Sequence, residues 1–169
     1  GDPYSMGEAS NDQAFAPTHV RKHCGRALRG LDRYDFDIGG TLLDGKNIKV
    51  VDCGDVVGVA KDLAGNHGRS EQAIRKILAS GALPIIIGGD HAIPIPVFRA
   101  YEGCGPITLI QIDAHVDWRD EFHGVSDGLS SVIRRASEMK HIDEIYQIGL
   151  RSAGSGRPEE VEAALAYGA

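Results

Sequence analysis

The most informative segment of this sequence is Ile107-Thr-Leu-Ile-Gln-Ile112, followed at once by Asp113-Ala-His115-Val-Asp117. Its apolar first part predicts a buried β-strand, in which successive side chains point to opposite faces of a sheet. If the backbone stays extended, Asp113, His115 and Asp117 project to one side as carboxylate, imidazole and carboxylate. A row of this kind favours the binding of one divalent cation, or of two.

A second apolar run ends in polar residues in the same way. Leu83-Pro-Ile-Ile-Ile87 is followed by Gly88-Gly89-Asp90-His91, about twenty residues upstream, which is within the spacing of one βαβ unit. Sites form at the carboxyl ends of the strands in open parallel α/β sheets. We therefore expect His91 to lie beside the three polar side chains of the first stretch. Gly88 and Gly89 either form a tight turn or cradle an anion.

Strand-like and helix-like segments alternate along the chain, which predicts βαβ units and a parallel sheet covered by helices on both faces. With 169 residues the chain suits a single domain, 1–169. Ser70 is a candidate N-cap of one helix, and Gly81 is suited to end it. We expect loops at 31–46 and 118–127. The expected helices span 18–31, 70–78, 94–101, 130–139 and 158–167, and the expected strands span 48–53, 83–87, 106–112 and 144–150.

The composition is that of an ordinary globular chain, with 42% hydrophobic and 25% charged residues. A formal net charge of −6, without a cluster of Lys or Arg, argues against nucleic-acid binding. No apolar run approaches the length of a transmembrane segment, so we expect no membrane partner. Cys24, Cys53 and Cys104 are scattered and odd in number, which favours a reducing, cytoplasmic setting.

Gly88-Gly89-Asp90-His91, together with Asp113-Ala-His115-Val-Asp117, resembles the paired motifs of the ureohydrolase family of arginase, agmatinase and formiminoglutamase. The opening Gly1-Asp-Pro-Tyr4 is similar to the family's first loop, and Arg134-Arg135-Ala136 and Ile148-Gly-Leu-Arg151-Ser152 are similar to agmatinase segments. The resemblance implies an arginase-like α/β fold, a parallel sheet between two layers of helices. It extends over the first half to two thirds of a usual member, without its first strand. We therefore expect a domain that is truncated at both ends.

The resemblance also implies a reaction, the manganese-dependent hydrolysis of a guanidino compound with release of urea. Two Mn²⁺ ions would share a hydroxide that attacks the guanidinium carbon. His91 and Asp117 would bind one ion and His115 the other, with Asp113 bridging the two. Carboxylate and imidazole suit Mn²⁺, and neither motif holds a thiolate that would favour Zn²⁺. Asp90 would support this centre from outside it or hold the turn by hydrogen bonding.

Two departures from the family pattern bear on activity. The family's remaining metal ligands lie in a later Asp-x-Asp motif, and this chain has no aspartate after Leu150. We therefore expect the chain to be part of a larger enzyme and to be inactive by itself. The family's proton-shuttling histidine is also displaced, because His123-Gly124 lies early and alignment on Arg134-Arg135-Ala136 places Leu129 at that position. His123 is thus either the general acid or an exposed loop residue.

Arg119 is the candidate substrate-binding residue. Arginases have an asparagine at this position, and a guanidinium group can pair bidentately with a carboxylate. Arg119 would then favour a guanidino acid such as guanidinobutyrate over agmatine, whereas the alternative is a solvated loop arginine. Trp118 would form a wall of the pocket or pack on its rim.

Other functions stay open from the sequence. One is a formiminoglutamase-type hydrolase, and another is a different α/β metal hydrolase such as a deacetylase-like amidohydrolase. A third is a non-catalytic α/β module with at most one weak metal site. For an enzyme, the resemblance implies a small guanidino substrate and a homo-oligomer, a trimer or a hexamer.

Overall fold

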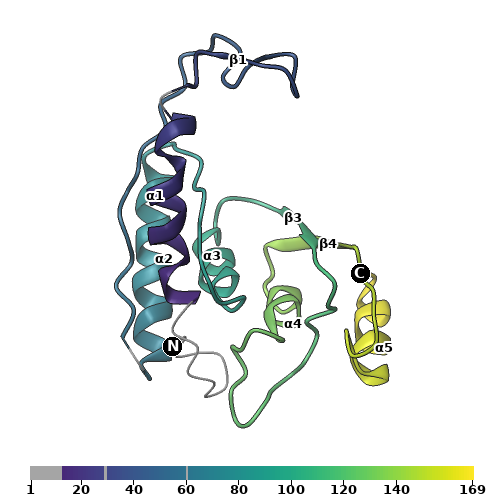
Figure 1. Cartoon of the computed structure of the whole chain (residues 1–169). Helices are drawn as coiled ribbons and strands as arrows, with labels where there is room; N and C mark the ends of the chain where they lie inside the picture. Colours follow the sequence, from purple (N-terminus) through teal and green to yellow (C-terminus); the bar gives the residue numbers. More distant parts are fainter. Residues whose placement is uncertain (1–12, 29, 60) are drawn as a thin grey trace.

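The computed structural model describes residues 13–28, 30–59 and 61–169 (Figure 1). The segment Gly1–Tyr4, to which part of the resemblance refers, lies outside the described residues. No described helix is long and apolar enough to cross a membrane. The elements are, in order, the 3-10 helix η1 (Gln13–Phe15), α1 (Ala16–Leu28), β1 (Tyr34–Asp35), β2 (Gly40–Thr41), α2 (Leu63–Ala79), α3 (Pro94–Ala100), β3 (Ile107–Ile112), α4 (Val132–Ser137), β4 (Ile142–Ile148) and α5 (Pro158–Tyr167).

β3 and β4 pair in parallel, with Ile107 opposite Ile142 at the start of the ladder. Parallel neighbours need a long connection, and here the loop after β3 and α4 together cross from one strand to the next. The predicted α/β fold with parallel strands is confirmed. β4 lies two residues earlier than the predicted strand at 144–150, because the backbone leaves the strand at Gly149, which has a φ of +97°.

The hydrophobic core lies on one face of the β3–β4 pair. β3 turns Ile107 and Leu109 toward this core and leaves Ile110 and Ile112 on the opposite, exposed face. α4 packs against β4, and α3 packs between α4 and α2 (Figure 1). The described helices therefore cover one face of the pair. The buried core residues are Ala92, Ile95, Val116, Trp118, Val132, Ile133, Ala136, Ile142, Ile145 and Ala164.

α2 begins at Leu63, so the prediction that a helix starts with Ser70 as its N-cap is wrong. Asp62 is the N-cap residue, and its side chain accepts a hydrogen bond from the Gly65 amide at 3.0 Å. Two glycines in the first turns weaken the helical pattern in the sequence and hide this start. The end is as predicted, because Gly81 follows the C-cap with a φ of +77°.

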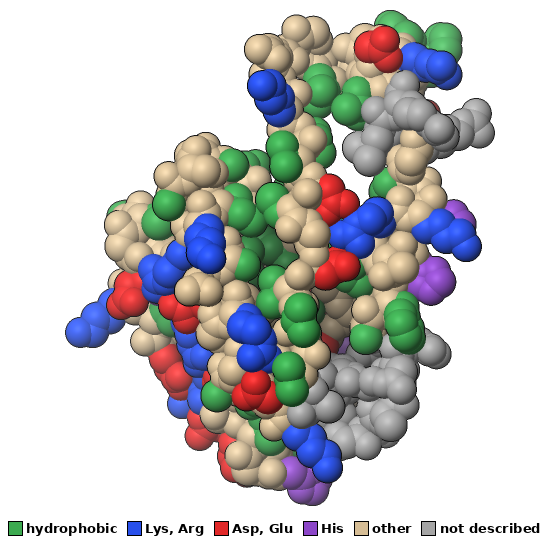
Figure 2. All heavy atoms as spheres, turned by 90° about the vertical axis from the view of Figure 1, so that its left-hand side faces the viewer, with side chains coloured by type: hydrophobic (Ala, Val, Ile, Leu, Met, Phe, Trp, Pro, Cys, Tyr) green, Lys and Arg blue, Asp and Glu red, His purple; other side chains and the backbone are tan. Residues whose placement is uncertain are grey.

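The predicted strands 48–53 and 83–87 are wrong as strands, since neither forms a ladder with any described residue. Both runs are apolar, but a strand forms only where a second strand accepts and donates the ladder hydrogen bonds. Their side chains remain exposed, up to 83% for Leu83 and 71% for Val51. Figure 2 shows hydrophobic side chains at the surface on the side of the molecule that carries α1 and α2. The exposed apolar residues of the segment before α2 include Val50, Val51 and Val57.

The predicted loop at 31–46 contains a short antiparallel hairpin, β1–β2, in which Tyr34 pairs with Thr41. The hairpin projects at the top of Figure 1, away from the core. Its apolar side chains are exposed as well, Phe36 most of all. The hairpin therefore adds little to the buried core.

Candidate metal centre

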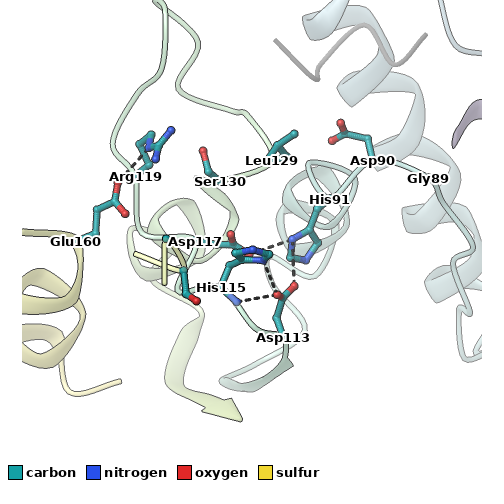
Figure 3. Close-up of a pocket in the computed structure, with 12 residues that line it drawn as sticks. Gly89, Asp90, His91, Asp113, His115, Asp117, Arg119, Leu129, Ser130 and Glu160 are labelled. Atoms are coloured by element: carbon teal, nitrogen blue, oxygen red, sulfur yellow. Dashed lines mark hydrogen bonds and ion pairs between the residues drawn. The ribbon is translucent and has the colours of Figure 1, made fainter. Parts of the chain in front are cut away.

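Three of the four predicted metal ligands meet at the carboxyl end of β3 (Figure 3). His91 lies in the turn before α3, whereas Asp113 and Asp117 follow β3. The Nδ1 atom of His91 is 3.0 Å from Oδ2 of Asp117 and 3.6 Å from Oδ2 of Asp113. One donor atom from each of the three residues lies within 4.8 Å of the other two. A single cation could therefore contact all three residues.

His115 lies next to this group but outside it. Its Nδ1 atom is 3.0 Å from Oδ1 of Asp113, and its side chain is largely exposed. The expected extended row is wrong, because the backbone turns after β3. Asp113 Oδ1 accepts a hydrogen bond from the His115 amide at 2.9 Å, and Asp117 has a φ of +47°. The role of His115 as a metal ligand stays a prediction.

The charges in this group act on one another. The hydrogen bond to Asp117 raises the pKa of His91 above its ordinary value, although burial of the ring opposes this. Burial acts to raise the pKa of Asp113, but hydrogen bonds from His115 and the charges of the two histidines outweigh it and hold that pKa below its ordinary value. The Asp113 carboxylate is thus kept ionised, which is the state that binds a cation.

Asp90 holds the turn before α3. Its Oδ1 atom accepts a hydrogen bond from the Ala92 amide at 2.5 Å, while its Oδ2 atom is buried and has no hydrogen-bond partner among the described residues. Gly88 and Gly89 do not have positive φ, so the expectation that they serve a turn of that kind is wrong. A Cβ at Gly88 would meet the Cδ1 end of the Ile93 side chain, which would have to move aside.

A cavity of about 410 Å³ opens over the group. Its lining includes Gly89, Asp90, His91, Asp113, His115, Asp117, Arg119, Leu129, Ser130, Gly154, Ser155 and Glu160. The donor set of carboxylates and imidazoles without a thiol fits a divalent cation such as Mn²⁺.

Arg119 lines the cavity and is paired. Its Nε atom donates to Oε1 of Glu160 in α5 at 3.0 Å, and its guanidinium lies 4.9 Å from the centre of the Phe122 ring. The second oxygen of Glu160 accepts the Arg157 amide at 3.0 Å. Arg119 is therefore held in place rather than solvated, and its predicted role in substrate binding stays a prediction. Glu160 was missed by the sequence analysis, because it looked like an ordinary first-turn acid.

His123 is exposed and does not line the cavity. It contacts Phe122 edge to face, with ring centres 4.2 Å apart. Leu129 lines the cavity instead, next to Ser130 (Figure 3). This geometry agrees with the alternative of an exposed loop histidine, and the predicted catalytic role of His123 is not supported by it.

Trp118 neither forms a wall of the cavity nor packs on its rim, so both expectations for it are wrong. The residue is buried in the core, and its ring lies 5.6 Å from that of Tyr167 in α5. The reason is that the backbone turns at Asp117 and directs the next side chain inward.

Comparison with known proteins agrees with this arrangement. A model of the arginase family matches residues 1–168. A formimidoylglutamase of Halalkalibacterium halodurans is 32% identical over 94% of this chain and 49% of its own length, and a guanidinobutyrase of Pseudomonas aeruginosa is 36% identical over 72% and 38%. The solved structure of proclavaminate amidino hydrolase from Streptomyces clavuligerus superposes with a TM-score of 0.76 at 26% identity, over 98% of this chain and 54% of that one. The chain spans about half the length of the relatives that it matches.

Proposed function

Because the chain belongs to the arginase family, we propose that it forms part of a manganese-dependent hydrolase that cleaves a C–N bond of a guanidino or formimino group. The observation that carries this proposal is the convergence of His91, Asp113 and Asp117 at one end of β3. For a guanidino substrate the product would be urea.

In this proposal His91 and Asp117 would hold one Mn²⁺ ion, His115 would hold a second, and Asp113 would contribute to both. When bound, the ions supply an activated water and polarise the substrate. The carboxylates provide the negative charge that retains the ions. The proton that joins His91 to Asp117 must leave before a cation binds there, since a metal-ligating imidazole nitrogen carries no proton.

We propose that Arg119 recognises a carboxylate at the far end of the substrate. Its Nε atom is used by Glu160, which leaves both terminal nitrogens for a bidentate contact. The named substrates of the formimidoylglutamase and the guanidinobutyrase carry a carboxylate, whereas agmatine ends in an amine. A guanidino acid is therefore the preferred substrate class. Hydrolysis of a formimino acid, as by a formiminoglutamase, is the second candidate.

We further propose that residues 1–169 form one α/β domain, that the working protein is a homo-oligomer, and that it works in a reducing compartment such as the cytoplasm. In support of the last point, Cys24, Cys53 and Cys104, which all lie in the described ranges, form no disulfide.

The proposal is tested on the protein as expressed from its gene. Isothermal titration with Mn²⁺ is expected to give two sites in the wild type and to lose them in a His115→Ala/Asp117→Ala variant. Product assays with guanidinobutyrate, agmatine and N-formiminoglutamate then identify the substrate, since the first two release urea and the third releases formamide. Absence of any Mn²⁺ site in the wild type would overturn the hydrolase and leave a non-catalytic α/β module.

A further inference from the structure

A pair of amide side chains, one buried and one partly buried, is hydrogen-bonded to the candidate metal centre. Gln111 of β3 and Gln147 of β4 are partners in the parallel register. The Nε2 atom of Gln147 donates to Oε1 of Gln111 at 2.5 Å, and Gln111 is 7% exposed. A glutamine inside an apolar strand loses hydration, so its amide is retained only where it is hydrogen-bonded.

The direction of this network is fixed at both ends by groups that can only accept. Gln147 Nε2 also donates to the carbonyl of Val116 at 2.8 Å, so Gln147 must present its NH₂ group to the network. Gln111 consequently accepts from Gln147 with its oxygen and turns its own NH₂ group toward Asp117. That group donates to Oδ2 of Asp117 at 2.8 Å.

Asp117 needs such support, because its backbone is in the left-handed region with a φ of +47°. A residue other than glycine stays in that region only where its surroundings hold it. The Asp117 carbonyl accepts the amides of Ile133 and Arg134 at 3.1 and 3.2 Å, which fixes the main chain. Gln111 fixes the carboxylate, and the same Oδ2 atom faces His91.

We propose that Gln111, oriented by Gln147, is the positioning residue for the Asp117 metal ligand. An amide directs the carboxylate into the cavity and leaves its full negative charge for the cation, whereas an arginine or lysine in that place would compete with the cation. The inference rests on the proposed metal centre. Groups that orient a metal ligand from behind commonly change metal affinity by about 10- to 100-fold when they are removed.

The test is Mn²⁺ titration of the full chain as wild type, Gln111→Met, Gln147→Met and Gln72→Met. Methionine keeps the length of the side chain and removes the amide. We expect about 10- to 100-fold weaker binding in Gln111→Met, a smaller loss in Gln147→Met, and no change in Gln72→Met, which makes the same substitution at an exposed site on α2.

Two further readouts separate positioning from a merely structural role. The rise in melting temperature on adding Mn²⁺ is measured from each variant's own metal-free baseline, and it is expected to shrink in Gln111→Met and Gln147→Met. The electron paramagnetic resonance spectrum of the bound Mn²⁺ is expected to change in both variants and not in Gln72→Met.

The outcomes distinguish the two proposals. If the wild type binds no Mn²⁺, the proposed metal centre fails and this inference fails with it. If the wild type binds and Gln111→Met binds equally well with an unchanged spectrum, the metal centre stands and the positioning role is overturned. Should Gln111→Met not fold, Gln147→Met decides, because unchanged affinity there means that the orientation of Gln111 does not matter.

Discussion

Two regions of the molecule treat the same kind of side chain in opposite ways. In the region from Asp90 to the C-terminal end, the apolar run of β4 pairs with β3, and its Ile145 is 3% exposed and packs in the core. In the region from 30 to 89, Ile85 is 81% exposed and belongs to no strand. The two regions differ in whether a second strand lies beside the apolar run, and not in the run itself.

β3 contains the same contrast within one strand. Its inner residues contact the core, whereas Ile112 on its outer face is 82% exposed. A strand of a parallel sheet reads as a continuous apolar run because both of its faces are ordinarily covered. An apolar run therefore indicates that a strand is suited to burial. Pairing with a second strand and coverage by helices decide whether the strand is buried.

The largest expected effect tests this contrast with one substitution in each region. Ile133→Ala removes a fully buried side chain, and we expect it to lower the free energy of unfolding by about 3 kcal/mol. Ile85→Ala is expected to change it by less than about 0.5 kcal/mol, since an exposed side chain loses no packing. Urea unfolding of both variants checks the difference. Equal losses would show that the two regions are packed alike in solution.

A smaller effect is expected from the ion pairs of the two regions. Glu160 is nearly buried and accepts bonds from Arg119 and from a backbone amide, so Glu160→Gln should destabilise by about 2 kcal/mol. Arg21 of α1 and Asp52, which lies in the region from 30 to 89, form an exposed pair with Nε and Oδ2 2.6 Å apart. Asp52→Asn should leave the urea midpoint unchanged within error. If Asp52→Asn destabilised the protein as much as Glu160→Gln, the pair of Arg21 and Asp52 would not be solvent-exposed.

The pH dependence of stability should come from the region from Asp90 to the C-terminal end, which contains Asp127. Hydrogen bonds from His67 and Arg99 lower the pKa of Asp127 to about 2. Because the folded pKa lies below the ordinary value, this stabilisation is complete above about pH 4 and is lost as the pH falls through 2. After allowance for solvent screening it amounts to about 1 kcal/mol.

Asp127→Asn should therefore be less stable than the wild type at pH 6, and the two stability curves should converge toward pH 2. Thermal unfolding between pH 2 and pH 6 measures both curves. Parallel curves would mean that Asp127 contributes nothing through its charge.

Local signals account for the parts that the sequence predicted well. Pro94 and Pro158 stand at the starts of α3 and α5, and both helices lie where they were expected. The approach of His91 to Asp113 was predicted from two strand ends, but only Asp113 follows a strand, and His91 comes from the turn before α3. The starts of the two helices depend on residues near each other in the chain.

The missed features depend on contacts between distant residues. Glu160 reaches Arg119 across 41 positions, and Gln147 reaches Gln111 across 36. The left-handed backbone of Asp117 is held by amides of α4, which no pattern near Asp117 indicates. For the same reason the strands predicted at 48–53 and 83–87 are wrong, since pairing is decided elsewhere in the chain.

The smallest expected effect on stability is the sharpest test of the exposed region. Val51→Lys and Ile85→Lys place a charge on largely exposed surfaces, so the free energy of unfolding should change by less than about 0.5 kcal/mol. Exposed apolar runs favour association, and both variants should sediment with less self-association at high concentration than the wild type. Ile110→Lys, on the exposed outer face of β3, is the matched control: it makes the same kind of substitution in the region from Asp90 to the C-terminal end. If the lysines instead destabilise the chain strongly, these surfaces are covered in solution, and the contrast between the two regions disappears on assembly.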